Sequence, residues 1–511
     1  MLPSSLRIAL PLLFAGFVAA AQDPLPRSVP ETEGVSAAAV SAFVDAASHG
    51  RNEFHSFMLL RHGKVVAEGW WNPYAPDLKH TLYSCSKSFT AAAVGFALTE
   101  GRLHLTDKII SFFPDDVPNP VPPFLAELTV KDALMMSDGQ EPDPTPTVVV
   151  DGNWAKKFLA IPIVHEPGTK FLYNSTGTYM LAAVVQKATG QTVLDYLKPR
   201  LFGPLGITGE DWETSPQGVN TGGWGLRLKT EDMAKFGQLY LQGGKWHDKQ
   251  ILPQSWVTEA TTMKIMQDPD APPSKKDSSD WLQGYCFQMW RCRHNGVRAD
   301  GAFGQYIIML PDEDAVIAIQ SETADMQNEI NLVWQYLLPA LHPAALPADP
   351  HADEQLKSQL AALALAPPTV ATAPAADPFS GKTFTLEPNA KRMNAVTFNQ
   401  KGDALELTIK GDSATYAIRF GKAQWIKGIT TRSGPNLLTG ANHHDAGLPA
   451  FQIAGSYQWV DDHTLKLVLR YIESPHTETM ICHADGNTLS IEDQSSFQYG
   501  KGAIKINGTQ Q

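Results

Sequence analysis

Ser84 and Lys87 are the residues of this chain whose types and spacing most directly suggest chemistry. They lie three positions apart, and on a helix this separation places two side chains on one face, with Cβ atoms about 5–6 Å apart. A serine hydroxyl is a weak nucleophile until a neighbour takes its proton, and a lysine that burial keeps neutral can take it. The pair is therefore a candidate for nucleophilic catalysis without a histidine.

The segment after this pair supports the interpretation. It reads SFTAAAVGFAL from position 88, which is too apolar for a helix that faces solvent. We therefore expect a central helix that begins near Ser84, where the positive field of the N-terminus favours negative charge on the hydroxyl. We also expect Lys87 to be partly buried, which is unfavourable for a lysine without a partner or a function. The spacing alone also fits an N-cap serine followed by a solvated lysine.

The elements around the pair predict an α+β domain over residues 22–345. Apolar residues at helical spacing indicate helices, and short apolar runs between turn residues indicate strands. Helices are expected over 86–103, over 180–188 and from 230 to 239, and strands over 57–68 (a pair around a His-Gly turn), 305–310 and 315–319. Strands near both ends, with helices between them, predict one sheet built from both ends of the domain.

The C-terminal part of the chain has a different pattern. Residues 346–377 form an Ala/Pro-rich stretch around one short helix at 354–365, a composition typical of a linker. From 378 to 511, short alternating segments such as LELTI and LKLVL are separated by turn residues. This spacing predicts a small antiparallel barrel or sandwich. We find no catalytic set of residues in it.

The first 21 residues resemble a secretory signal peptide. Arg7 precedes an apolar run over 8–18, and the alanines at 19–21 offer a small-residue cleavage site. The run is shorter than the ~20 apolar residues that a membrane span needs. We therefore expect an exported protein, periplasmic or extracellular, with no transmembrane span in the mature chain.

Charge and cysteine content argue against several classes of function. A formal net charge of -12 and a sequence pI near 5.7 disfavour nucleic-acid binding, which needs a basic surface. Cys286 and Cys292 could pair, or all four cysteines could be small packed residues. The sequence contains no CxxC or HExxH zinc signature and no GxSxG elbow. We expect no metal or organic cofactor.

Several further sequence segments occur along the chain in the order that a known family of enzymes uses. The string YSCSKSFTAAAVGFALTEGRLHLTDKI opens at position 83, LMMSDG follows at 134–139, and PGTKFLYNST follows at 167–176. Later blocks lie at 222–241, 246–256 and 301–311. In this order they resemble the nucleophile helix, a helix-ending turn, the tyrosine segment and the final strand of the serine hydrolases related to penicillin-binding proteins and class C β-lactamases. The resemblance covers roughly residues 30–340.

The resemblance implies a β-lactamase/transpeptidase-like fold and assigns roles to named residues. Ser84 would be the acylated nucleophile and Lys87 its activating partner. Tyr173 matches the tyrosine of the family's Y-x-N motif and would relay a proton to the leaving group. The oxyanion hole would be built from the backbone amides of Ser84 and Gln305, with Gly304 beside it.

Two segments leave alternatives open. The third residue of Y-x-N is Ser175 here, and Asn174 beside it could supply an amide after an adjustment of one residue. Both stay candidates for substrate binding. The triplet at 137–139 (SDG) could be compared with the S-D-N loop of class A β-lactamases, but the preceding residues predict a helix. We therefore expect it to be the turn that ends this helix.

This sequence departs most clearly from the family at the third motif. That motif is a Lys or His followed by a small residue and Gly, and it aligns here with AFG at 302–304, which lacks a cation. A substrate carboxylate would find no partner there. His294, or Arg291, Arg293 and Arg298, could substitute from another strand position. Esters or small amides fit such a pocket better than β-lactams or D-Ala-D-Ala peptides.

The sequence thus predicts an exported serine hydrolase that cleaves an ester or amide through an acyl-enzyme on Ser84. Small-molecule or peptide-like substrates are expected, D-amino-acid-containing or β-lactam-like compounds and cell-wall material among the candidates. Two alternatives stay open. One is a true β-lactamase or D,D-peptidase, and the other is a non-catalytic binding protein that keeps the fold and the serine.

Overall fold

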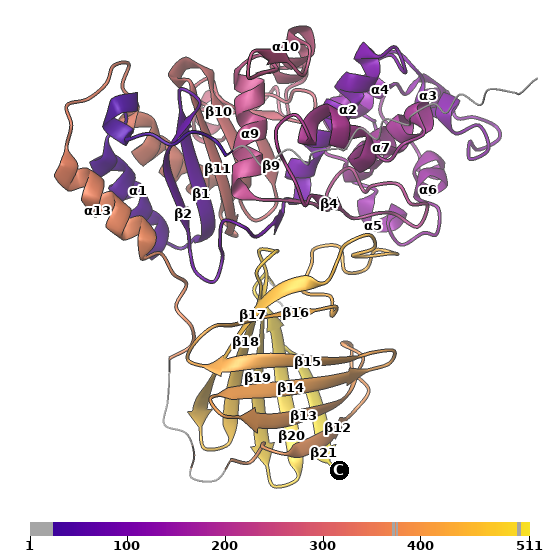
Figure 1. Cartoon of the computed structure of the whole chain (residues 1–511). Helices are drawn as coiled ribbons and strands as arrows, with labels where there is room; N and C mark the ends of the chain where they lie inside the picture. The colour runs from indigo at the N-terminus through magenta and orange to yellow at the C-terminus, as the bar shows by residue number, and fades with distance from the viewer. Residues whose placement is uncertain (1–23, 370–373, 375–376, 498–501) are drawn as a thin grey trace, which may run out of the picture.

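The computed structural model of the chain describes residues 24–369, 374, 377–497 and 502–511. A domain of helices and strands lies above a β-barrel in Figure 1, and the barrel follows it in the chain. The predicted signal peptide, residues 1–21, lies outside the described residues. Within the described ranges, no helix is both long enough and apolar enough to cross a membrane.

A six-stranded antiparallel sheet, in the order β2-β1-β11-β10-β9-β8, frames the first domain. Its strands are β1 (Glu53–Arg61), β2 (Lys64–Trp70), β8 (Trp290–Arg291), β9 (Val297–Gly301), β10 (Gln305–Leu310) and β11 (Ala315–Glu322). β1 and β2 are joined by a tight turn in which His62 and Gly63 both have positive φ, 48° and 74°. Because β1 pairs with β11, the sheet joins both ends of the domain, which confirms the prediction.

Helices cover both faces of this sheet and also form a separate helical half of the domain (Figure 1). They are α1 (Ala37–His49), α2 (Ser86–Thr99), α3 (Pro123–Glu127), α4 (Val130–Leu134), α5 (Thr145–Val148), α6 (Trp154–Ala160), α7 (Ser175–Thr189), α8 (Val193–Leu197), α9 (Thr230–Leu241), α10 (Gln254–Thr261), α11 (Pro273–Ser278), α12 (Met326–Leu332) and α13 (Pro350–Ala361). Side chains alternate across the sheet. Phe57 and Ile308 therefore share a core with α1 and α13, whereas Met58 and Ile307 share one with α2 and α9.

Short strand pairs complete the first domain. They are β3 (His80–Thr81), β4 (Asp211–Trp212) and β5 (Leu226–Leu228) in one small sheet, and β6 (Lys245–Trp246) with β7 (Lys249–Gln250) in another. The helices predicted from the pattern are present, with shifted ends. α2 stops at Thr99, before the expected residue 103, and the chain turns at Gly101 with φ 66°. α7 begins at Ser175 because Asn174 caps it.

The stretch predicted as a linker, 346–377, belongs in part to the first domain. Asp349 caps α13 by accepting a hydrogen bond from the amide of Ala352, so the helix begins at Pro350, four residues before the expected position. Leu356 is buried in the core that α13 shares with α1. Ala/Pro composition indicated a linker, but the apolar face of this helix binds it to the sheet domain.

The C-terminal domain is a closed barrel, so the sandwich alternative is wrong. Its strands are β12 (Lys382–Leu386), β13 (Met393–Lys401), β14 (Ala404–Gly411), β15 (Thr415–Lys422), β16 (Ile426–Thr430), β17 (Phe451–Asp461), β18 (Thr464–Tyr471), β19 (Thr477–Asp485), β20 (Thr488–Ser495) and β21 (Ile504–Gln510). A short parallel pairing of β15 with β17 closes the sheet. Alternate side chains fill its interior, including Phe398, Leu407 and Leu467.

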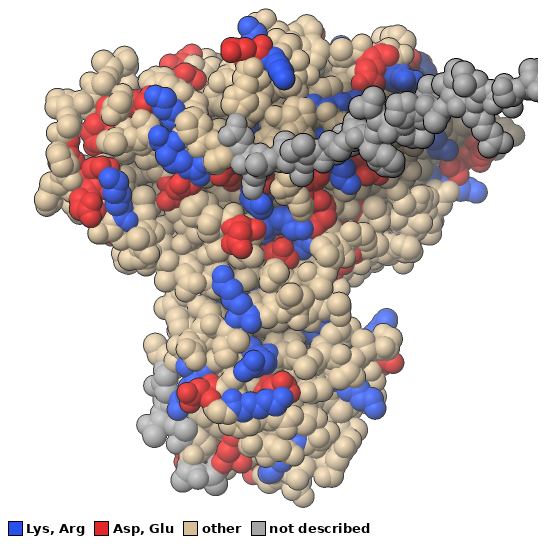
Figure 2. Space-filling model, viewed as in Figure 1, with Lys and Arg blue, Asp and Glu red and all other residues tan. Residues whose placement is uncertain are grey.

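Polar contacts tie the barrel to the first domain. Arg470 of β18 donates to both carboxylate oxygens of Glu53 in β1, at 2.6 and 3.0 Å. The hydroxyl of Tyr74 donates to the carbonyl oxygen of Ser474 at 3.2 Å. Figure 2 shows a narrow waist between the two domains, with basic and acidic side chains interspersed on this face.

All four cysteines are free and buried. The thiol of Cys286 donates to the carbonyl oxygen of Thr261, and Arg298 donates to the sulfur of Cys292. The pairing of Cys286 with Cys292 that the sequence left open is therefore not formed. Both residues act as small packed side chains, the other reading of the sequence.

Candidate active site

Ser84 lies in a single 3₁₀ turn, Tyr83–Cys85, that leads directly into α2. Most of α2 is buried because its Ala and Phe side chains pack in the main core. At the start of this helix Lys87 is only 1% exposed, whereas Ser84 is partly accessible. The structure thus confirms the central helix and the buried lysine.

The Lys87 amine is surrounded by oxygen atoms. Its Nζ lies 3.1 Å from Oγ of Ser84, 3.0 Å from Oγ of Ser175 and 2.7 Å from the carbonyl oxygen of Gly223. A lysine that has lost one proton has two N–H donors and one lone pair. It can therefore donate to Gly223 and Ser175 while it accepts a hydrogen bond from Ser84. This is the arrangement that activation of a serine requires.

Burial determines the charge of this amine. It lowers the pKa of Lys87 from its ordinary value of 10.5 to about 7, because the charged form loses its hydration. The negative charges of Asp143 and Asp300 act in the opposite direction and do not cancel the effect. A large fraction of Lys87 is therefore neutral near pH 7, as a general base must be.

Tyr173 lies on the other side of this amine. The Nζ of Lys87 is 5.0 Å from the centre of the Tyr173 ring, which stacks on Trp290 with centroids 5.8 Å apart. Burial raises the pKa of the Tyr173 phenol above its usual value of 10, and the interaction with the Ser84 hydroxyl offsets only part of this. The phenol is therefore protonated at neutral pH and can donate a proton beside the serine.

Asn174 and Ser175, the two candidates for the third position of Y-x-N, have different contacts in the structure. Asn174 is buried, and its side-chain oxygen accepts hydrogen bonds from the amide of Gly177 and the hydroxyl of Thr176. It is the N-cap of α7. Ser175 instead lines the cavity in front of Ser84 and contacts Lys87.

The end of β9 is pressed against the serine turn. A Cβ at Gly301 would lie 2.2 Å from the carbonyl oxygen of Leu82 and 3.2 Å from the amide nitrogen of Cys85, so only glycine fits there. The next residue, Ala302, lines the same cavity as Ser84. The backbone beside the nucleophile is therefore that of residues 301 and 302.

Gln305 and Gly304, which the sequence alignment placed at the oxyanion hole, are not among the residues that line the cavity. Gln305 begins β10, pairs with Gly301, and donates from its side-chain amide to the carbonyl oxygen of Ser321 at 2.8 Å. Gly304 lies against Glu329, because a Cβ at Gly304 would be 1.9 Å from Oε2 of that residue. The backbone of Gln305 still lies beside the serine turn, because its carbonyl oxygen accepts a hydrogen bond from the thiol of Cys85 at 3.0 Å.

The structure does not bring His294 to this cavity either. His294 is exposed, and its ring packs on Trp334, 5.0 Å away. Arg298 is buried and binds Asp300 at 2.8 Å. Of these groups only the carboxylate of Asp300 lines the cavity, and it is partly neutralised by Arg298. The third motif lacks a cation, and no Lys, Arg or His among the described lining residues replaces it.

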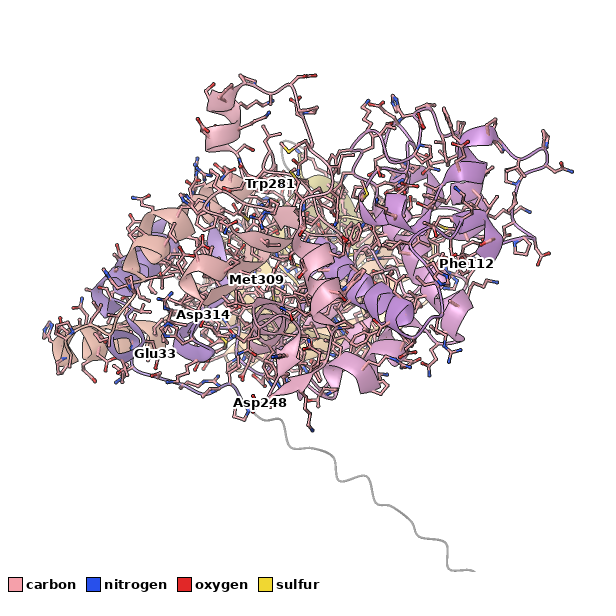
Figure 3. All side chains as sticks on the ribbon, turned by 90° about the horizontal axis from the view of Figure 1, so that it is seen from above. Glu33, Phe112, Asp248, Trp281, Met309 and Asp314 are labelled. Carbon is pink, nitrogen blue, oxygen red and sulfur yellow. The ribbon has the colours of Figure 1, made fainter. Side chains whose placement is uncertain are left out.

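The cavity in front of Ser84 has a volume of about 550 Å³. Its described lining contains no Lys, Arg or His and includes five aromatic side chains: Tyr83, Ser84, Asp143, Thr145, Pro146, Tyr173, Ser175, Gly223, Trp224, Trp281, Trp290, Asp300, Ala302, Met326, Leu437 and Leu438. Viewed from above, Trp281 lies near the junction of the sheet half and the helical half, which contains Phe112 (Figure 3). The cavity is therefore lined from both halves of the domain, with Ser175 from the helical half and Trp290 from the sheet.

Sequence reasoning missed most of this lining. Trp281 and Trp290 carried no motif, although two tryptophans near a candidate final strand are a usable signal for an aromatic wall. Leu437 and Leu438 come from the barrel, in the long segment between β16 and β17. Nothing in the sequence connects them to a serine more than 350 positions away.

Comparison with known proteins identifies the family. The Beta-lactamase family model matches residues 43–338, more than half of the chain. The chain belongs to the Beta-lactamase family. It is therefore a serine hydrolase of the amide or ester type, which confirms the expected class of enzyme and fold.

Named relatives refine this placement. The 6-aminohexanoate-dimer hydrolase of Paenarthrobacter ureafaciens is 26% identical over 289 residues, 53% of this chain and 73% of that protein. A putative D-alanyl-D-alanine carboxypeptidase of Escherichia coli (strain K12) is 29% identical over 143 residues, but these cover 25% of this chain and only 33% of the relative. The structure of a putative 6-aminohexanoate-dimer hydrolase from Bacillus anthracis shares the fold, with a TM-score of 0.52, 21% identity, and coverage of 64% of this chain and 89% of that one.

Replacing Ser175 with alanine is expected to lower kcat on the order of tenfold with little change in Tm, because Lys87 loses a hydroxyl partner at 3.0 Å. The matched variant Asn174→Ala should instead cost about 1–2 kcal/mol of stability through loss of the α7 cap. Ester hydrolysis and thermal melts of both variants separate the two roles. Loss of turnover in Asn174→Ala at an unchanged Tm would show that Asn174 is the functional residue.

Proposed function

We propose that this protein hydrolyses uncharged esters or amides through an acyl-enzyme on Ser84. The observation that carries the proposal is the buried Lys87 amine between the hydroxyls of Ser84 and Ser175, at the base of a cavity whose described lining holds no cation. The relative named 6-aminohexanoate-dimer hydrolase supports hydrolysis of an amide, and the preference for uncharged substrates rests on the cavity lining.

Acylation follows from the contacts of Ser84. Its Oγ attacks the substrate carbonyl carbon while its proton passes to the lone pair of Lys87. The carbonyl oxygen becomes an oxyanion, and we assign its two donors to the backbone amides of Ser84 and Ala302. The intermediate then expels the alcohol or amine, which takes a proton from Tyr173, and Lys87 restores the proton of the phenol.

Deacylation runs the same groups in the opposite direction. A water molecule takes the place of the leaving group and attacks the acyl carbon, and its proton passes to the neutral amine of Lys87, directly or through the Tyr173 hydroxyl. Collapse returns the proton to Ser84 and releases a carboxylic acid. The balance is one ester or amide and one water consumed, and one acid and one alcohol or amine released.

The cavity walls select against anionic substrates. Trp224, Trp281 and Trp290 offer apolar surface, and the charged groups on the described lining are the carboxylates of Asp143 and Asp300. A substrate carboxylate would meet negative charge without a cation to bind it. This argues against a β-lactamase or D,D-peptidase, whose substrates carry a carboxylate.

A substrate panel tests this proposal. We expect p-nitrophenyl esters and small uncharged amides to be hydrolysed with kcat/KM at least ~10-fold above that of nitrocefin and of D-Ala-D-Ala peptides. The Ser84→Ala variant is the control for uncatalysed and contaminant hydrolysis. Nitrocefin turnover that equals ester turnover and requires Ser84 would identify a β-lactamase instead. Binding of these compounds without any turnover would favour the non-catalytic alternative.

The predicted export and the use of cell-wall material belong to this proposal and rest on sequence alone. Localisation of the mature N-terminus, by mass spectrometry of the protein from culture medium and cell fractions, tests cleavage after residue 21.

A further inference from the structure

Tyr83, the residue before the nucleophile, has an unusual backbone conformation. Its φ is +46°, in the left-handed region, where a large side chain is unfavourable. Tyr83 is also buried, at 3% exposure, although it lines the cavity beside Ser84. A strained residue at this position persists only if surrounding contacts hold it.

The contact that holds Tyr83 comes from the barrel. Its hydroxyl lies 2.5 Å from Nε2 of His476, which is in the turn between β18 and β19. The amide of Leu437, also from the barrel, donates to the same hydroxyl at 3.4 Å. Both partners are more than 350 residues from Tyr83 in the chain, and both approach from outside the first domain.

His476 is itself held by a carboxylate of the first domain. Its Nδ1 lies 2.7 Å from Oε1 of Glu322, the last residue of β11, and the hydroxyl of Ser496 donates to the same oxygen at 2.6 Å. A proton on Nδ1 satisfies both contacts of the ring, because Nδ1 then donates to Glu322 and Nε2 accepts from Tyr83. The imidazole is fully buried.

The same imidazole also contacts the turn between β9 and β10, which holds the second candidate oxyanion donor, Ala302. Phe303, which follows Ala302, also has a left-handed backbone, with φ +66°. Its ring is 4.7 Å from that of His476 and 5.3 Å from that of Tyr83. One ring from the barrel therefore contacts the neighbours of both backbone amides that we assign to the oxyanion.

We propose that His476 is a positioning residue for catalysis, through which the barrel fixes the backbone of Ser84 and Ala302. This inference rests on the proposed acyl-enzyme function. The pair Glu53–Arg470 and the bond from Tyr74 to Ser474 connect the two domains without His476. The domains are thus also joined by contacts that do not involve His476, whereas the His476 ring reaches the residue before Ser84.

The test uses paired substitutions in the full-length protein. His476→Gln places an amide oxygen near the former Nε2 and can still accept from Tyr83. His476→Asn reaches only as far as the former Nδ1, and Tyr83→Phe removes the hydroxyl itself. Tyr74→Phe is the matched control, because it removes a hydroxyl that binds the same turn at the carbonyl oxygen of Ser474 and makes no described hydrogen bond to Tyr83 or to the His476 ring.

Three quantities are measured for each variant: Tm, the kcat and KM for a p-nitrophenyl ester, and the rate of Ser84 phosphonylation by a fluorophosphonate. We expect His476→Asn and Tyr83→Phe to lower kcat and the phosphonylation rate about tenfold or more, with KM within about twofold. His476→Gln should retain activity within about threefold of wild type, and Tyr74→Phe should be unchanged.

The outcomes are distinguishable. If the wild-type protein is not phosphonylated at Ser84, the proposed function and this inference both fail. If Ser84 reacts but His476→Asn matches His476→Gln, the positioning role alone is wrong. A loss of rate that simply follows Tm in every variant, Tyr74→Phe included, would show that His476 only stabilises the junction between the domains.

Discussion

Replacing Ser84 with alanine is expected to abolish covalent labelling and to lower kcat by roughly 10⁴-fold or more. The neighbouring thiol of Cys85 does not replace Ser84, because it is fully buried and donates to the carbonyl oxygen of Gln305. Burial also raises the pKa of this thiol well above its ordinary range. Fluorophosphonate labelling, followed by mass spectrometry of the modified peptide, measures this result.

Ser86→Ala is the matched control for that experiment. Ser86 is two positions away and fully buried, and its hydroxyl accepts a hydrogen bond from the amide of Leu226. Its loss should cost about 1–3 kcal/mol of stability by leaving that amide unpaired, while the labelled residue stays Ser84. Labelling that persists in Ser84→Ala, or that maps to another residue in wild type, would overturn the assignment.

The pH dependence of kcat/KM is expected to report Lys87. Below pH about 7 the amine is protonated and cannot accept the proton of Ser84, so kcat/KM should fall about tenfold per pH unit. Above that pH it should level off, because the lysine is then neutral. Lys87→Arg keeps a charge at every accessible pH and should be inactive throughout the profile.

Lys87→Met tests the lowered pKa of Lys87 through stability. This substitution should remove activity but raise the free energy of unfolding. The folded-state pKa of Lys87 is lowered from 10.5, so between about pH 7 and 10.5 the unfolded chain binds more protons than the folded one. Wild-type stability should therefore rise with pH across this window. The stability that Lys87→Met gains should be largest below pH 7 and should shrink toward pH 10.5. Urea unfolding at pH 6 and pH 9 measures the difference, and an identical gain at both values would contradict the lowered pKa.

Several features of the fold could be predicted because they depend on local sequence. The Ser84–Lys87 spacing and the apolar residues after it specify a buried helix, and alternating segments after residue 378 specify an antiparallel β domain. The start of α13 was mispredicted because a cap at Asp349 outweighs the composition of the surrounding Ala/Pro-rich stretch. Caps and turns involve neighbours within three or four residues, so such errors shift an end and leave the element in place.

The position of the oxyanion backbone could not be predicted in the same way. The alignment placed the backbone amide of Gln305 beside the nucleophile. In the structure Ala302 lines the cavity with Ser84 and Gln305 does not, so we assign the second donor to Ala302 as part of the proposed function. A motif aligned by residue type does not specify which side of a hairpin turn faces a cavity. That depends on the strand pairing and on the close approach of Leu82.

By itself the sequence predicted the candidate nucleophile, its lysine and the tyrosine segment, because a helical spacing and short ordered motifs encode them locally. Only the tertiary structure decided that Ser175 rather than Asn174 contacts the amine. It alone also showed that the cavity lacks a cation on its described lining and that His476 of the barrel contacts the residue before Ser84. These contacts join elements up to some 390 residues apart. They arise from the packing of two domains, which no local pattern of residues records.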